Sequence, residues 1–290
     1  EGSRLLGTLY LDPFMRKGKA VQSAQFTLQG SKKMPDGEQT PSTCLVFNFP
    51  VGGHGLPVSY AVTFMHEIGH ALHSLLSETD FQHLSGTRGA VDFVEFPSHL
   101  FEHFVLDANC LASYATHLRS NEAMPMALQQ SYQKRSSEFA HIDAVQQLMY
   151  ATVDQAFYSY FPEAGSQTEA VQDFLVDRLH RFDKDLDIPV SGSLSQLLGL
   201  SRTSKFDHLV HYGGSYYCYI FNRALSAHVW KHGFEANPFR GESGAKLRDF
   251  FRGGSVVQSL AEIQAMCPQA AGFSADDIPL DAFVAQLTPK

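Results

Sequence analysis

The chain has 290 residues, of which 44% are hydrophobic and 12% aromatic, enough apolar material to bury a sizeable core. Its formal net charge of −8 at pH 7 comes without long runs of one sign, which excludes the basic footprint of a nucleic-acid-binding protein. No stretch reaches the roughly 18 consecutive apolar residues of a membrane span, and the first residues lack the pattern of a secretory signal. We therefore expect a globular protein with no nucleic-acid partner and no membrane span.

The four cysteines lie far apart and form no C-x-x-C pair, so the sequence predicts neither a disulfide framework nor a cysteine zinc site. We interpret them as buried free thiols of a reducing compartment. Glu1 stands where an initiating Met is usual, and we interpret this as the sign of a processed protein or a fragment.

The chain changes character near residue 55. Before it, three short runs rich in β-branched and aromatic residues alternate with turn residues: "LLGTLYLDPF", "AQFTLQG" and "TCLVFNFP". After the loop "PVGGHGLPVS", helical spacing continues with interruptions to the C-terminus. We therefore predict a mainly α fold, with a small antiparallel β-sheet over about residues 5–50, helices over about 58–110, and a helical bundle in the remainder. No repeat or long linker divides the chain, so a single domain over residues 1–290 is expected.

The stretch "FMHEIGHALHS", residues 64–74, carries the strongest chemical signal. We predict a helix here that begins near Ser59, a candidate N-cap. His66 and His70 are four residues apart, so their imidazoles project from successive turns, as two nitrogen ligands must to share one zinc ion. Glu67 follows the first histidine and can reach a water on that ion without being a ligand, which is where a general base belongs.

The same helix makes two structural predictions. Gly69 costs about 1 kcal/mol relative to Ala inside a helix, so its presence predicts the close approach of another element. The helix is also expected to be amphipathic, with an apolar stripe on one face and polar residues on another: Val62, Met65, Leu72 and Leu76 against Thr63, His66, His70 and His73.

The motif needs a third ligand to form a zinc site, because an H-E-x-x-H match arises by chance with a probability of roughly a few per cent in such a chain. The acidic candidates that follow are Glu78, Asp80, Asp92, Glu95, Glu102 and Asp107. Asp92 is typical of a helix start, and Glu95 then falls in the first turn beside Pro97, a residue tolerated there. Glu95 can complete the metal site from this second helix, but it can equally cap its own helix in a D-x-x-E arrangement.

Four ordered blocks resemble the catalytic half of the thimet oligopeptidase family (M3) of zinc peptidases: "HEIGHALHS", "SGTRGAVDFVEFPSHLFEHF", "FDHLVHYGGSYYCYIFNRAL" and "FFRGGS". The preceding "LGTLYLDPFMRKGKA" is similar to the family's strand and loop before the active site, and the Gly-Gly-Ser at 253–255 is similar to its late motif. The resemblance therefore runs essentially from end to end of the chain.

This resemblance implies a zincin-like catalytic domain and a zinc-dependent endopeptidase activity. It assigns one Zn²⁺ per chain to His66, His70 and Glu95, with Glu67 as the general base. Family members are considerably longer and wall their substrate channel with an N-terminal helical half. The resemblance thus implies that this chain is a catalytic half, whose partners are a peptide or precursor-protein substrate and the missing N-terminal half.

The resemblance also assigns a group of donors that contact the substrate and the transition state: His208, Tyr212, Tyr216 and Tyr219. Such side chains supply the neutral donors that stabilise a developing oxyanion. Gly213 and Gly214 are expected to let this loop move over the cleft. The alternative is a tyrosine-rich helix end packed in the core, which suits Tyr217 and Cys218 better than the others.

Within the family, "FQHLSGTR" and the loop length of "HLVHYGGSYYCY" resemble the branch that removes N-terminal octapeptides from precursors imported into the mitochondrial matrix. "DFVEFPS" is shared with the family's bacterial dipeptidyl carboxypeptidases, and His211 stands where a Gly is usual. A dipeptidyl carboxypeptidase and a general oligopeptidase of the cytoplasm therefore remain alternatives. From other classes, we consider an inactive zinc-containing peptide-binding module and a structural helical protein with a chance motif.

Two further residues near the motif each have two interpretations. His73 either contacts a zinc ligand or is a partly exposed helix residue. Glu102, two turns after Glu95, either orients a zinc ligand through its other ring nitrogen or forms a solvated salt bridge. His54 is a candidate for lining the cleft. No role is assigned to the other polar residues nearby, which are His83, Arg88, His99 and His103.

Overall fold

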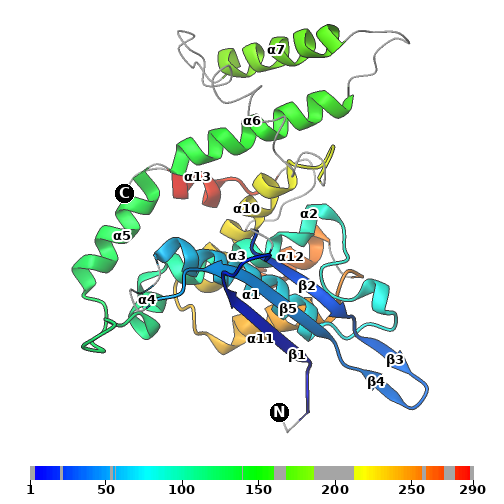
Figure 1. Ribbon diagram of the computed structural model, residues 1–290, viewed down its shortest axis with the longest axis vertical. Coiled ribbons are helices and arrows are strands. Elements are labelled where there is room, and N and C mark those ends of the chain that lie inside the picture. The colour runs from blue at the N-terminus through cyan, green and yellow to red at the C-terminus, as the bar shows by residue number, and fades with distance from the viewer. Residues whose placement is uncertain are drawn as a thin grey trace. The chain divides into compact units, whose positions relative to one another are not determined.

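The computed structural model of the chain describes residues 4–19, 22–52, 55, 57–138, 140–159, 168–185, 212–256, 259–270 and 278–287. The chain divides into two compact units, one formed by residues 1–138 with 222–290 and the other by residues 139–221. Helices dominate both, with a small sheet near the N-terminus (Figure 1), which confirms the predicted mainly α fold. The expectation of a single catalytic domain stays a prediction.

A three-stranded sheet opens the first unit. Its strands, in order across the sheet, are β1 (Thr8–Phe14), β5 (Ser42–Phe49) and β2 (Ala24–Gln29). β2 pairs with β5 antiparallel, but β1 pairs with β5 in parallel, so the expectation of a purely antiparallel sheet is wrong in this respect. The physical reason is the connection: the chain between β1 and β5 is long enough to run back along the sheet before β5 begins.

The helices of the first unit follow the sheet in two groups. The first group is α1 (Val58–Leu76), the 3₁₀ turn η1 (Gln82–Leu84), α2 (Val91–Val94), α3 (Phe96–Leu106), α4 (Ala108–Tyr114) and α5 (Met126–Glu138). The second group is the π-helical turn η2 (Trp230–Phe234), α11 (Gly241–Arg252), α12 (Leu260–Met266) and α13 (Asp281–Leu287). α10 (Cys218–Val229) begins in the second unit and ends in the first.

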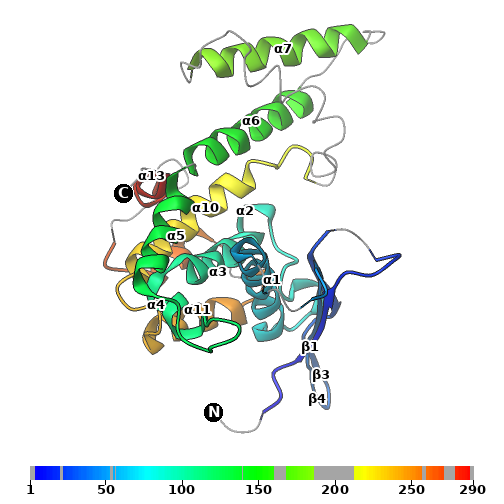
Figure 2. The ribbon, with the colours of Figure 1, turned by 60° about the vertical axis from the view of Figure 1, so that its left-hand side comes forward.

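α1 is the central element of the first unit. It lies between the sheet on one side and α3 and α11 on the other (Figure 2). The side that faces the sheet packs on β5 in one apolar cluster, made of Tyr60, Phe64, Ile68 and Ala71 from the helix and Leu45, Phe47 and Phe49 from the strand. The stripe predicted for this helix is not the face that packs on β5, and its residues are only partly buried: Val62, Met65, Leu72 and Leu76. Pro57, rather than Ser59, occupies the N-cap.

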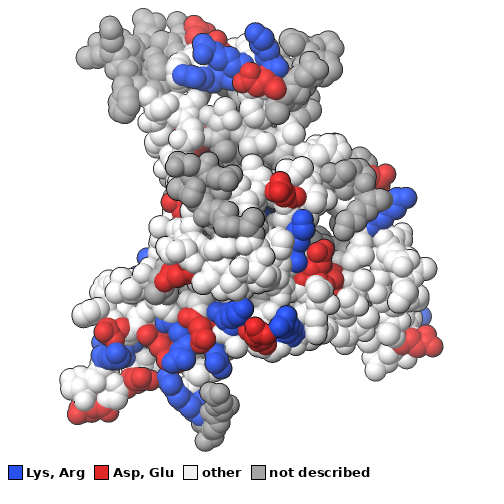
Figure 3. All heavy atoms as spheres, turned by 180° about the vertical axis from the view of Figure 1, so that it is seen from behind, with Lys and Arg blue, Asp and Glu red and all other residues white. Residues whose placement is uncertain are grey.

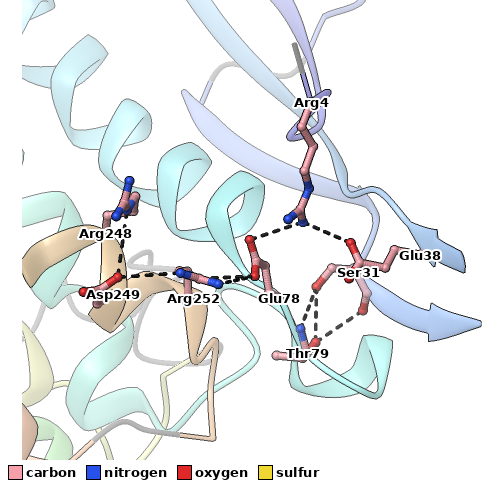
Figure 4. A network of polar contacts seen from close by, with 8 residues as sticks. All are labelled: Arg4, Ser31, Glu38, Glu78, Thr79, Arg248, Asp249 and Arg252. Carbon is pink, nitrogen blue, oxygen red and sulfur yellow. Dashed lines mark hydrogen bonds and ion pairs between the residues drawn. The ribbon is translucent and has the colours of Figure 1, made fainter. Parts of the chain in front are cut away.

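A chain of ion pairs connects the N-terminal segment to the hairpin of β3 (Lys32–Met34) and β4 (Gly37–Gln39), to the segment after α1 and to α11 (Figure 4). Arg4 donates to Glu38 at 3.0 Å and to Glu78 at 3.2 Å, and Arg252 of α11 donates to Glu78 at 2.8 Å. Glu38 lies in the β3–β4 hairpin. These side chains are largely exposed, so each pair contributes only about 0–1 kcal/mol, but together they connect segments far apart in sequence.

The second unit is built on two long helices, α6 (Ala140–Ser159) and α7 (Thr168–Asp185), which pack on each other. Its core contains side chains from both helices and from the segment before α10: Met149, Tyr150, Ala151, Val153, Leu179 and Tyr216. The core therefore joins α6 directly to the tyrosine-rich segment that the sequence singled out.

The charged side chains show no large area of one sign on the face seen in Figure 3, where acidic and basic residues lie interspersed. Among the residues that the structure describes, no helix combines the length and the apolar character needed to cross a membrane.

Candidate metal centre

Two helices of the first unit bring the predicted ligands together. α1 carries His66 and His70 one turn apart, and Glu95 lies at the junction where α2 ends and α3 begins. Pro97 follows in the first turn of α3, where its missing N–H has no helical partner to lose. The local chain geometry therefore puts the carboxylate at the start of α3, beside α1.

Gly69 allows α1 and α3 to approach at this point. A Cβ added to Gly69 would lie 2.5 Å from the backbone oxygen of Pro97 and 2.7 Å from Cα of Ser98. Both distances are too short for real atoms, and both partners are backbone, which cannot swing aside. The prediction that Gly69 accommodates a neighbouring element is confirmed, and that element is the one that carries Glu95.

The ligand atoms converge on one point. Glu95 Oε2 lies 3.4 Å from His66 Nε2 and 3.2 Å from His70 Nε2, and the three side chains form a group that could hold a metal ion. Nitrogen and oxygen ligands sit about 2.0–2.2 Å from a tetrahedral zinc, so neighbouring ligand atoms are about 3.3–3.5 Å apart. The donor set and its spacing therefore fit a zinc ion with three protein ligands and one open position.

The side chain of Glu95 does not cap α3, contrary to the alternative interpretation. Glu95 occupies the N-cap of α3, but no side-chain cap hydrogen bond forms there. Its carboxylate instead accepts a hydrogen bond from Ser98 Oγ at 2.9 Å and turns toward the two histidines. Glu95 is buried, with 4% of its surface exposed, so these partners replace the water that the carboxylate has lost.

Glu102, two turns further along α3, contacts the ring of His66 on the side away from Glu95. His66 Nδ1–H donates to Glu102 Oε1 at 2.6 Å, and His99 Nδ1–H donates to the same oxygen at 3.2 Å. Because Nδ1 of His66 is committed to Glu102, Nε2 is the ring nitrogen that faces Glu95 and is left to bind a metal. His66, His99 and Glu102 form a second group with metal-ligand spacing, but the short hydrogen bond already uses Nδ1 and the carboxylate oxygen. The contact matches the orienting role proposed for Glu102.

The electrostatics of this centre favour two anionic carboxylates. Burial favours the neutral form of each, but the neighbouring histidines outweigh burial and hold the pKa of both Glu95 and Glu102 below the usual value. Burial likewise disfavours the charged form of His66, yet its hydrogen bonds to the two carboxylates raise its pKa to about 10. A site with this surplus of fixed negative charge attracts a divalent cation.

Glu67 lies beside the ligand group without belonging to it. It is 7% exposed, and burial raises the pKa of its carboxyl, against the opposing effect of His70 and His66. A carboxylate with a raised pKa accepts a proton more readily than an ordinary surface glutamate.

His73 is not a partly exposed helix residue. It is completely buried, its ring lies 5.3 Å from that of Phe251, and its Nε2 lies 3.4 Å from the backbone oxygen of Gly254. Burial lowers its pKa to about 4. Ser255 N–H in turn donates to Leu84 O at 2.8 Å, so the Gly-Gly-Ser motif joins the end of α1 to the loop after it. His73 is a core residue that links these elements.

The remaining polar candidates have other environments. His103 stacks on Trp230 with ring centroids 5.3 Å apart, and burial lowers its pKa to about 4. His83 and Arg88 are exposed. His54 lies outside the described residues, so its suggested place in the cleft stays a prediction.

The predicted tyrosines lie in the second unit. The Tyr219 ring lies 5.3 Å from that of Tyr212 and 5.1 Å from that of Tyr216. Tyr216 is only 4% exposed, and its hydroxyl donates to Gln147 Oε1 at 3.0 Å, so the structure gives it a packing role. Tyr217 is 37% exposed, and the expectation that it packs in the core is wrong.

Two other predictions for this segment have different outcomes. Cys218 is fully buried, as expected. His208 lies outside the described residues, so its contact with substrate stays a prediction. The catalytic assignments of the three tyrosines also stay predictions.

One residue that contacts this segment was missed by sequence reasoning. Asp154 of α6 is 1% exposed and accepts hydrogen bonds from the backbone N–H groups of Gly214 and Tyr216, both at 2.9 Å. A single Asp inside a helix carries no motif, and its partners lie 60 and 62 positions away. Only the period of α6, which turns Asp154 inward with the apolar residues, offered a signal.

The fold and the ligand group define a mainly helical protein with a candidate metal centre of the zinc-peptidase type. The chain belongs to peptidase family M3, whose family model matches residues 1–275. This confirms the resemblance on which the ligand assignment was based.

Several curated relatives share a name. The chain is 36% identical over 259 residues to the mitochondrial intermediate peptidase of Arabidopsis thaliana, covering 87% of this chain and 35% of that protein. The rat protein of the same name is 32% identical, covering 99% of this chain and 39% of the relative, and the human protein is 30% identical, covering 97% and 39%. The chain thus spans less than two fifths of the length of these relatives.

Proposed function

We propose that this chain is the catalytic part of a zinc-dependent endopeptidase. The observation that carries the proposal is the convergence of His66 Nε2, His70 Nε2 and Glu95 Oε2 at tetrahedral ligand spacing. One Zn²⁺ per chain bound there would act as a Lewis acid and lower the pKa of a bound water to about 7. The membership of the chain in peptidase family M3 supports the same conclusion.

In the proposed mechanism, the residues of this chain bind and move protons around the scissile bond. Glu67 accepts a proton from the attacking water and returns it to the leaving amine. Glu102 keeps the proton of His66 on Nδ1, so that Nε2 remains a ligand throughout. No covalent bond between the chain and the substrate is required.

The tyrosine-rich segment supplies donors to the oxyanion in this proposal. Tyr212, Tyr219 and His208 are the candidates whose hydroxyl or ring N–H would face the carbonyl oxygen of the substrate. Tyr216 is a weaker candidate for this role, because its hydroxyl already donates to Gln147.

The substrate that we propose is a precursor protein, from which the enzyme removes an N-terminal octapeptide in the mitochondrial matrix. The support is the shared name of the relatives, mitochondrial intermediate peptidase, together with the resemblance of "FQHLSGTR" to that branch. The remainder of those longer proteins would supply the other wall of the substrate channel, as a partner of this chain.

The test is metal analysis followed by cleavage of a panel of quenched fluorescent peptides of graded length. We expect one zinc per chain and cleavage that a chelator abolishes. Glu67→Gln should keep its zinc and lose about 10²–10⁴-fold in turnover, because the general base is absent. Glu235→Gln, at an exposed position, is the matched control and should behave as wild type.

The outcomes separate the alternatives. Unchanged turnover in Glu67→Gln would refute the assignment of the base, and absence of stoichiometric zinc would refute the metal centre. Peptides that bind a zinc-loaded chain without being cleaved, even after the rest of the family fold is supplied, would favour a binding module. Removal of dipeptides from the C-terminus, or indifference to the N-terminal octapeptide, would favour the other branches of the family.

A further inference from the structure

The segment that carries the predicted tyrosines is held by one face of α6. We call residues 212–217 the tyrosine loop. Asp154 Oδ1 accepts the N–H of Gly214 and Oδ2 accepts the N–H of Tyr216, each at 2.9 Å. Both oxygens of a carboxylate that is 1% exposed are therefore committed to the backbone of this loop. Hydrogen bonds to a charged acceptor are roughly twice as strong as neutral ones, and more costly to leave unmade when buried.

Other side chains of α6 complete the contact. Gln155 Nε2 donates to the backbone oxygen of Gly214 at 2.7 Å, and Gln147 Oε1 accepts the hydroxyl of Tyr216 at 3.0 Å. Positions 147, 154 and 158 lie on one face of α6 because they are separated by about one, two or three turns, and position 155 lies at the edge of that face. The loop is thus held at its backbone and at one side chain by the same surface.

The two glycines of the loop differ in what their surroundings demand. A Cβ added to Gly213 would lie 2.2 Å from Oη of Tyr158, so a larger residue there would have to displace that exposed ring. Gly214 has φ of +74°, in the left-handed region that favours glycine. The expectation that these glycines let the loop move stays a prediction.

These contacts determine how the tyrosines are presented. Tyr216 is anchored in the core, while Tyr219 contacts the rings of both Tyr216 and Tyr212. Within the loop, Ser215 N–H donates to Tyr212 O at 2.8 Å, which closes the turn before α10. A shift of the backbone at Gly214 would therefore displace Tyr212 and Tyr219 together.

We propose that Asp154 is a positioning residue, which fixes the conformation of the tyrosine loop and thereby the placing of Tyr212 and Tyr219 for the reaction. The contact between Asp154 and the loop stands on its geometry alone. Its consequence for turnover rests on the proposed function.

The test is Asp154→Asn, measured by amide hydrogen exchange and by peptide cleavage. Asn has the same size, but its NH₂ group cannot accept, so one of the two loop N–H groups loses its partner. We expect exchange in residues 212–217 to rise roughly tenfold or more, with exchange in α1 and α3 and the zinc content unchanged. We also expect kcat to fall roughly 10- to 100-fold with little change in KM, because the displaced groups act in the transition state.

Two further variants keep the test decisive. Asp173→Asn removes an exposed carboxylate from α7 of the same unit and should change neither measurement. Gly214→Ala leaves α6 intact and strains only the loop, so it should reproduce the exchange and turnover effects of Asp154→Asn.

Three results would overturn the proposal. Unchanged exchange in residues 212–217 would show that Asp154 does not hold the loop. A uniform rise over α6 and α7 would show a general structural role. A local rise with unchanged kcat would show that the loop is held without consequence for the reaction. If the zinc-loaded wild type cleaves no peptide, the proposed function fails, whereas the exchange measurement still decides whether Asp154 holds the loop.

Discussion

The candidate metal centre and the tyrosine loop obtain their geometry in different ways. His66, Glu67 and His70 are placed by the period of one helix, and Glu95 reaches them because Gly69 lets α3 approach. The tyrosine loop has no such local frame. It is held by hydrogen bonds to side chains of α6, and Asp154, which makes two of them, lies 60 residues before Gly214 in the chain. Groups carried by helices are positioned more precisely than groups carried by a loop, so the loop depends more on these side chains.

The difference also concerns charge. The metal centre collects buried carboxylates and imidazoles whose pKa values are shifted by one another, so it is stable only as a set. In the second unit, Asp154 is instead satisfied by neutral backbone N–H groups. The predictions below test whether the first region behaves as a set, from the largest expected effect to the smallest.

The largest effect is expected from removing a ligand. His66→Ala and Glu95→Ala should each lose stoichiometric zinc and all measurable cleavage, because two ligands and water do not make a stable structural or catalytic zinc site. Zinc content by mass spectrometry and helicity by circular dichroism measure this. His83→Ala, at an exposed histidine, is the matched control. Full zinc content in either ligand variant would contradict the assignment.

The next effect concerns the close packing of the two helices. Gly69→Ala should reduce the free energy of unfolding by about 1–3 kcal/mol and weaken zinc binding, because the added Cβ pushes against the backbone of Pro97 and displaces Glu95. Gly244→Ala is the matched control: a Cβ there meets nothing within 4 Å, so helix propensity should stabilise α11 by up to about 1 kcal/mol. Urea unfolding measures both. Equal effects of the two substitutions would show that helix contact does not constrain Gly69.

Glu102→Gln should have a smaller effect on the same centre. Removing an outer partner of a metal-binding histidine typically weakens metal binding by about 10–100-fold. We expect zinc affinity to fall in this range with the fold retained, as measured by competition with a chelator. Glu122→Gln, at an exposed glutamate, is the control. Unaltered affinity would mean that the 2.6 Å contact with His66 does not orient the ligand.

The smallest effect at neutral pH is expected from the buried histidine behind the centre. Burial lowers the pKa of His73 to about 4, while an unfolded histidine titrates near pH 6.5. Between these pH values the unfolded state binds more protons, so the free energy of unfolding should fall as the pH falls, by up to about 1.4 kcal/mol per pH unit. His73→Gln should flatten this dependence between pH 6.5 and 4 in chelator-treated protein, relative to the exposed control His83→Gln. A slope unchanged by His73→Gln would contradict the assignment.

Much of the first region could be predicted from the sequence because its determinants are local. A separation of four residues places two histidines on one helix face in any fold, and a Gly inside a helix signals close contact wherever the partner comes from. The role of Glu95 could not be predicted from spacing alone, because its position in the sequence suits a helix cap equally well. In the structure its side chain turns toward the two histidines. The family resemblance supplied that choice in advance.

The predictions that were wrong concern features that depend on contacts between residues far apart in the chain. The direction of β1 relative to β5 depends on the path of the connection, which alternation of apolar residues does not encode. The burial of His73 depends on α11 and the Gly-Gly-Ser segment, which lie some 180 residues later, as the 181-residue separation of its hydrogen-bond partner shows. Likewise Tyr216, rather than Tyr217, lies in the core, where its ring packs with residues of α6 and α7 and its hydroxyl donates to Gln147.

The sequence by itself determined the mainly helical fold, the helix of the H-E-x-x-H motif, and the family to which the chain belongs, because spacing along one helix is a property of neighbouring residues. Tertiary structure alone decided which carboxylate accepts the hydrogen bond of His66 Nδ1, which histidine is buried, and how the tyrosine loop is held. Those choices are made by hydrogen bonds between residues far apart in the chain, and the free energy of burying a polar group depends on the partner that it meets.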